Sequence, residues 1–173
     1  MQKVRRWIGI AGSWRKTNNQ VETDVRNTVI NLVKQGFGIV TGGALGVDYI
    51  VTDELLKLNP EADLIKIFLP VTLDKYIAHY KNRAKECVIN DNQFNNLSNQ
   101  LNKIKSINPQ AIIENKVNTE VNKETYYERN TKIVNQSDEL IAFHVNESKG
   151  VQDSIDKAKE KNIPVKIYKY TID

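Results

Sequence analysis

The stretch TGGALGVD at residues 41–48 decides the fold. It follows an apolar run at residues 37–41 and precedes a helical pattern at residues 47–58, which together predict a strand, a glycine turn and a helix. Adjacent glycines adopt backbone angles closed to other residues, and a helix start adds unpaired N–H donors and the positive end of its dipole. The stretch therefore predicts an anion site where a buried strand ends.

The same strand, loop and helix pattern recurs along the chain. Further strands are predicted at residues 7–11, 64–69, 140–144 and 165–170, and further helices at residues 21–33, 73–84, 125–135 and 151–161. Such alternation is typical of right-handed crossovers and a parallel sheet covered on both faces. We therefore predict an α/β fold, a Rossmann-like doubly wound and mainly parallel sheet with helices on both faces.

Length and composition match one globular domain, with 173 residues, 40% hydrophobic and 27% charged. We predict a single Rossmann-like nucleotide-binding domain over residues 1–173, with an asparagine-rich helical elaboration at about residues 87–122. In that elaboration, one helical stripe is apolar and consists of Phe94, Leu97, Leu101, Ile104 and Ile107. The stripe predicts burial, over the sheet or in a twofold dimer contact, and we expect a homo-oligomer.

Charge and cysteine content narrow the function classes. The formal net charge is +4 with basic and acidic residues interspersed, which permits an anionic partner without requiring one. One cysteine and two histidines exclude a disulfide within the chain and a zinc cluster, so we expect neither a metal nor a bound cofactor. Since no apolar run is long enough to span a membrane or to form a signal peptide, we expect a cytoplasmic protein with no membrane partner.

Ligands bind at the carboxyl ends of strands in an open parallel sheet, so the loops there carry the candidate residues. After the first strand, Ser13 can donate a hydrogen bond and Arg15 can form a forked contact to phosphate. Residues 146–151 place a serine, a lysine and a glycine at a predicted helix start, and residues 126–130 supply two tyrosines for base stacking and an Arg–Asn pair. The predicted ligand- and phosphate-binding residues are Gly12, Ser13, Arg15, Thr41, Gly42, Gly43, Ala44, Gly46, Asp48, Arg129, Asn130, Ser148, Lys149 and Gly150.

Each loop also has an ordinary structural interpretation, as a polar turn with solvated basic side chains or with Tyr126 or Tyr127 in the core. Residues 41–48 match neither the GxGxxG fingerprint nor the P-loop and lack its lysine, which disfavours a triphosphate hydrolase. Asp48 would repel a phosphate, so we assign it a ribose hydroxyl or the first-turn amides of its own helix. Valine at Gly43 or Gly46 is expected to abolish ligand binding and to leave the sheet folded.

Taken together, these motifs resemble those of the SLOG superfamily of Rossmann-like proteins, which includes the DNA-processing protein A (DprA/Smf) family and the LOG phosphoribohydrolases. TGGALGVD is similar to the glycine signature of the DNA-processing family. Residues 12–15 resemble its Gly-Ser-Arg loop with a tryptophan inserted, and Arg129-Asn130 followed by Ile133 resembles its later Arg-Asn helix. The resemblance covers most of the chain outside residues 90–122.

The resemblance also has a departure that bears on chemistry. LOG enzymes carry a PGGxGTxxE motif whose glutamate acts at the N-glycosidic bond, and in the matching residues 147–154 that position is Ser154. Asp153 lies about 100° away around the predicted helix and is a poor replacement. LOG-type hydrolysis is therefore disfavoured.

We expect the chain to bind a nucleotide or nucleotide-derived phosphate through glycine-rich loops at the carboxyl ends of the strands. One alternative is binding of single-stranded DNA, as the resemblance to the DNA-processing family implies. The other is a nucleoside-monophosphate hydrolase that uses Asp48, Glu128 or Asp153 at the N-glycosidic bond. Whether the chain is an enzyme stays open at this point.

Overall fold

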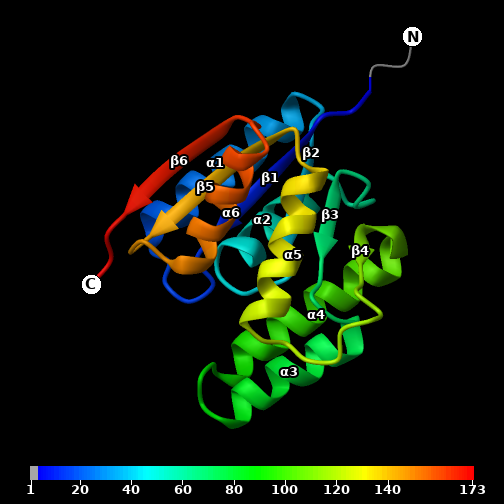
Figure 1. Ribbon diagram of the computed structural model, residues 1–173. Coiled ribbons are helices and arrows are strands. Elements are labelled where there is room, and N and C mark those ends of the chain that lie inside the picture. The colour runs from blue at the N-terminus through cyan, green and yellow to red at the C-terminus, as the bar shows by residue number, and fades with distance from the viewer. Residues whose placement is uncertain (1–3) are drawn as a thin grey trace.

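The computed structural model describes residues 4–173, which build one six-stranded sheet in the order β4-β3-β2-β1-β5-β6 (Figure 1). Its strands are β1 (Trp7–Gly12), β2 (Gly38–Gly42), β3 (Ile65–Phe68), β4 (Ile112–Ile113), β5 (Glu139–Val145) and β6 (Val165–Tyr170). Every neighbouring pair of these strands is parallel. The predicted Rossmann-like α/β fold is confirmed, and the sheet is parallel throughout.

Helices cover both faces of the sheet, as the apolar spacing predicts. They are α1 (Asn19–Lys34), α2 (Val47–Leu58), α3 (Leu73–Lys85), α4 (Asp91–Ile107), α5 (Lys123–Gln136) and α6 (Lys149–Glu160), with a short 3-10 helix η1 (Pro109–Ala111). In Figure 1, α5 and α6 lie in front of the sheet, and α1 and α2 lie behind it. No helix within residues 4–173 is both long and apolar enough to cross a membrane.

The order of the strands creates a switch point next to β1. From β1 the chain moves outward through β2, β3 and β4, and it then returns to the other side of β1 to form β5 and β6. The chain therefore turns toward one face of the sheet after β1 and toward the other face after β5. This divergence opens a crevice at the carboxyl ends of these two strands. At this edge Gly12 is level with Phe143.

The asparagine-rich elaboration forms α4, η1 and β4, and it packs on the same core as the sheet. Leu97, Leu101 and Ile104 are buried in one apolar cluster with residues of α1, α2 and α3, and Phe94 is partly buried against that cluster. Ile107, the last residue of α4, is 42% exposed, so the prediction of its burial is wrong. Because this chain itself covers most of the stripe, the stripe gives no reason for a dimer, and the homo-oligomer stays a prediction.

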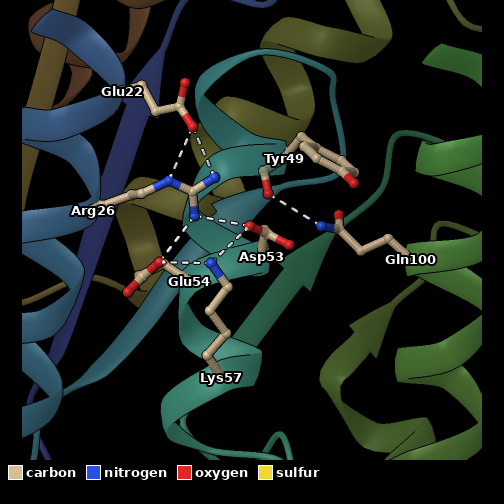
Figure 2. A network of polar contacts seen from close by, with 7 residues as sticks. All are labelled: Glu22, Arg26, Tyr49, Asp53, Glu54, Lys57 and Gln100. Carbon is tan, nitrogen blue, oxygen red and sulfur yellow. Dashed lines mark hydrogen bonds and ion pairs between the residues drawn. The ribbon is translucent and has the colours of Figure 1, made fainter. Parts of the chain in front are cut away.

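A network of polar contacts joins α1, α2 and α4 on the face away from α5 and α6 (Figure 2). Arg26 Nη1 of α1 lies 2.8 Å from Asp53 Oδ2 and 2.9 Å from Glu54 Oε2, both on α2. Gln100 Nε2 of α4 donates to the backbone carbonyl of Tyr49 at 3.1 Å. The network holds α2, and with it the glycine loop that precedes this helix.

Candidate functional site

A cavity of about 570 Å³ opens at the carboxyl ends of β1, β2 and β5. The loops after these strands line it, together with residues of α3, α5 and the first turn of α6. The cavity lies at the switch point between β1 and β5, where open α/β sheets bind their ligands. Its volume is within the range of small-molecule sites.

Most of the predicted binding residues come together in this cavity. Eleven of the fourteen line it, namely Gly12, Ser13, Arg15, Gly42, Ala44, Asp48, Arg129, Asn130, Ser148, Lys149 and Gly150. The other three, Thr41, Gly43 and Gly46, do not line it. The loops after three strands therefore converge on one site, as their positions along the chain predict.

Gly43 and Gly46 face packed protein. A Cβ atom on Gly43 would lie 2.6 Å from Leu69 Cδ2, and one on Gly46 would overlap the backbone carbonyl of Ser13. Gly46 also has a φ of +71°, a conformation that favours glycine. A valine side chain at either position would clash with packed protein atoms and would not occupy the space of a ligand. We therefore expect these substitutions to destabilise the fold, and not to block binding in a folded sheet as the sequence predicted.

Asp48 organises the loop between β2 and α2. Its Oδ1 accepts a hydrogen bond from Thr41 Oγ1 at 2.9 Å, and its Oδ2 accepts one from the backbone N–H of Ala44 at 3.2 Å. Burial raises the pKa of Asp48, against the opposing effects of Arg129, Thr41 and Ala44. Asp48 thus binds the glycine loop, and not the first-turn amides of α2 that the sequence analysis offered as partners.

Arg129 of α5 is the central cation of the site. Its side chain is 10% exposed, and its Nη1 lies 3.9 Å from Asp48 Oδ2. The same Nη1 is buried and has no hydrogen-bond partner within residues 4–173. A Cβ atom on Gly42 would overlap the guanidinium, so a larger residue at that position would displace the Arg129 side chain. Since buried polar atoms are nearly always paired, this nitrogen is available to an anionic ligand.

Ser148 supplies a second unpaired polar atom, at the start of α6. It occupies the N-cap position, but its side chain does not cap the helix. The buried Ser148 Oγ has no partner in the described part of the chain. Lys149 and Gly150 line the cavity beside it, so the first turn of α6 and the positive end of its dipole face the cavity. This combination is typical of an anion site.

The lining of the cavity is strongly cationic. It contains one carboxylate, Asp48, and six basic residues, namely Arg15, Lys16, Arg83, Lys123, Arg129 and Lys149. Lys16, Arg83 and Lys123 were missed in the sequence, as was the imidazole of His79. The spacing of His79 and Arg83, four residues apart on the helix after β3, is the signal that could have indicated a polar face there.

No protein-family model matches the chain, and no curated protein is significantly similar to it in sequence. DNA-processing protein A from Helicobacter pylori superposes with a TM-score of 0.67 at 22% identity, covering 94% of this chain and 64% of that one. The Streptococcus pneumoniae protein gives 0.63 at 16% identity, covering 94% and 50%. The molybdenum cofactor binding protein from Rippkaea orientalis gives 0.60 at 16% identity, covering 96% and 77%.

The chain shares the Rossmann-like fold of these proteins. At these identities the likeness establishes the fold alone. The chain spans 64% and 50% of the length of the two DNA-processing proteins. The Helicobacter pylori structure is described as showing a single-stranded DNA binding mode.

Aromatic side chains in this cavity already contact cationic side chains. Arg129 lies over the ring of Tyr126, at 5.3 Å from the guanidinium carbon to the ring centroid. Arg15 lies in the same way over Trp14, at 4.4 Å. Trp14 is 38% exposed and lines the cavity, so it is an aromatic ring close to solvent where a base can stack.

The carboxylates considered for hydrolysis are engaged elsewhere. Glu128 and Asp153 do not line the cavity. Asp153 Oδ2 accepts hydrogen bonds from Asn130 Nδ2 at 3.1 Å and from Lys157 Nζ at 2.8 Å. Asp48 lines the cavity, but both of its oxygens are bonded within the glycine loop. The described lining therefore offers no free carboxylate for chemistry at an N-glycosidic bond.

Proposed function

We propose that this chain binds a nucleotide or nucleotide-derived phosphate in the cavity at the ends of β1, β2 and β5. The observation that carries the proposal is the presence of two buried polar atoms without protein partners, Arg129 Nη1 and Ser148 Oγ, in one cationic cavity. An anionic ligand would satisfy both atoms. The structural neighbours support this chemistry, because one is described with single-stranded DNA and another with molybdenum cofactor, and both of these ligands carry phosphate.

Gly150→Leu is expected to weaken nucleotide binding without destabilising the fold. A Cβ atom on Gly150 meets no atom within 4 Å, and the residue lies in the first turn of α6 at the cavity. Leucine has a higher helix propensity than glycine, so its side chain would occupy open space at no cost to the helix. We expect an affinity loss of about tenfold or more for nucleoside 5′-monophosphates in isothermal titration calorimetry, equivalent to about 1.4 kcal/mol.

The titration uses the nucleoside 5′-monophosphates of all four bases, because the cavity does not identify the base. Glu160→Leu, an exposed position at the far end of the same helix, is the matched control and should bind as the parent does. Equal binding by the parent and by Gly150→Leu would place the phosphate away from α6.

Binding of single-stranded DNA is a second candidate, and the six basic residues in the cavity lining favour it. A strand that neutralises several phosphates loses affinity steeply with salt, by about 0.7 log units per contact for each log unit of salt. A mononucleotide held mainly by backbone N–H groups, Ser148 and Arg129 depends on salt much less.

We expect weak and strongly salt-sensitive binding of oligonucleotides, and tighter, salt-tolerant binding of a nucleotide. Fluorescence anisotropy with a labelled oligothymidine at several salt concentrations measures the first affinity, and calorimetry measures the second. Submicromolar oligonucleotide binding at physiological salt that is lost in Arg15→Ala and Arg129→Ala would reverse this ranking. A cytoplasmic location and self-association stay predictions, and neither candidate function depends on them.

A further inference from the structure

We propose that the cavity contains a second anion subsite on α3, formed by His79 and Arg83 together with Lys123 of α5. The ligand would then carry two anionic groups on opposite sides of one nucleoside. This inference rests on the proposed function, since it assumes that the first anion binds near Arg129 and Ser148.

The second subsite follows from the orientation of α3. His79 and Arg83 are one helical turn apart and both line the cavity. Tyr76 and Tyr80 of the same helix are buried in the core and fix the helix in place. The rings of His79 and Tyr80 make an edge-to-face contact with centroids 5.5 Å apart, which orients the imidazole.

The two anion subsites belong to distant parts of the sheet. The first is at the start of α6, after β5, and the second is on α3, after β3. Since β2 and β1 lie between β3 and β5, the two subsites are on separate sides of the cavity, which Arg83 and Lys123 both line. A single phosphate at α6 would leave the basic residues on α3 unneutralised, whereas a ligand with two separated anions would reach both.

Carboxylates on this side of the cavity do little to neutralise these basic residues. Glu86 lies 3.1 Å from Arg83, but it is itself exposed and does not line the cavity. Exposed ion pairs of this kind contribute about 0–1 kcal/mol, so a ligand anion exchanges readily for Glu86. Lys123 makes no ion pair with any residue that the structure describes. Arg83 and Lys123 are therefore both available to a ligand.

His79 provides a spectroscopic signal for this subsite. Partial burial and the nearby charge of Arg83 lower the pKa of His79, while Glu86 acts in the opposite direction. An anion bound beside the ring would favour the imidazolium and raise this pKa. The shift reports directly on occupancy of the α3 subsite, independently of affinity.

Isomeric nucleotides test whether the two anions are separated. For each of the four bases, calorimetry compares the nucleoside 5′-monophosphate, the 5′-diphosphate and the 3′,5′-bisphosphate. The 5′-diphosphate adds its second phosphate next to the first, and the bisphosphate adds it across the sugar. We expect the bisphosphate of the preferred base to bind about tenfold more tightly than either of the others, and to raise the pKa of His79 in NMR titrations.

Variants on α3 separate the second subsite from general charge. In Arg83→Ala, the ratio of bisphosphate to monophosphate affinity should fall to about one. Lys85→Ala removes an exposed charge from the same helix outside the cavity and should keep the parent ratio. If no monophosphate binds at all, the proposed function fails.

Three results would overturn the second subsite alone, given that monophosphates bind. The 5′-diphosphate could match the bisphosphate, the bisphosphate could show no gain, or the gain could survive Arg83→Ala. Each of these leaves the proposed function intact.

Discussion

Arg129→Met is expected to lower nucleotide affinity by about a hundredfold, the largest effect of any single substitution in the site. Removing one partner from a buried, hydrogen-bonded charge pair costs roughly 2–5 kcal/mol in binding. Arg129 is the cation whose buried Nη1 has no hydrogen-bond partner among the described residues, and it lies against the glycine loop. Calorimetry with the nucleotide that binds the parent measures the loss, and parent-like affinity would contradict the assignment.

The same substitution should change how stability depends on pH. Burial raises the pKa of Asp48 and Arg129 lowers it, so methionine at position 129 would raise this pKa further. A carboxyl whose pKa is higher in the folded state loses stability as pH rises from its unfolded value toward its folded value. The stability deficit of Arg129→Met relative to the parent should therefore be small in acid and grow toward neutral pH.

Urea unfolding at several pH values measures this deficit, which should approach about 3 kcal/mol where Asp48 is ionised. Adding Asp48→Asn to Arg129→Met removes the titrating group, so the double variant should lose the pH-dependent part of the deficit. Binding should stay weak in the double variant, because the cation is still absent. A deficit that is independent of pH would show that Arg129 does not act on Asp48.

Local patterns in the chain account for the sheet and for the position of the site. Apolar runs such as residues 140–144 are long enough for buried strands and end in polar loops, and parallel strands bring those loops to one edge. The convergence of Ser13, Gly42 and Ser148 on one cavity follows from this rule. The rule says nothing of the direction in which each side chain of a loop points.

What the sequence missed depends on packing between distant segments. Gly43 and Gly42 are neighbours in one loop, yet a Cβ atom on Gly43 would meet Leu69 and one on Gly42 would meet Arg129. Likewise, Arg83 lines the cavity because its helix, α3, packs against α4 at that end of the sheet. Figure 1 shows α3 beside α4, a placement that the periodicity of α3 alone does not predict. These features need the assembled structure, because they depend on the relative position of elements far apart in the chain.

Gly46→Ala is expected to destabilise the fold by about 3 kcal/mol, which combines a backbone cost of roughly 1–3 kcal/mol at φ +71° and ψ −127° with an overpacking cost of roughly 1–3 kcal/mol. Gly46 has a φ of +71°, and an added methyl group would overlap the backbone around Ser13 and Trp14. The backbone N–H of Val47 donates to the Ser13 carbonyl at 2.9 Å, so the methyl group would push apart two loops of the site.

Gly36→Ala is the comparison variant, because it measures the cost of a positive φ at a position where an added Cβ atom has no packing cost. Gly36 has a φ of +76°, close to that of Gly46, but an added Cβ atom there meets nothing within 4 Å. Its cost should therefore be only the left-handed penalty of about 1–2 kcal/mol. Urea unfolding of both variants gives the difference. If the two variants were equally stable, the contact between Gly46 and Ser13 would add nothing, and the two loops would not depend on glycine for their close approach.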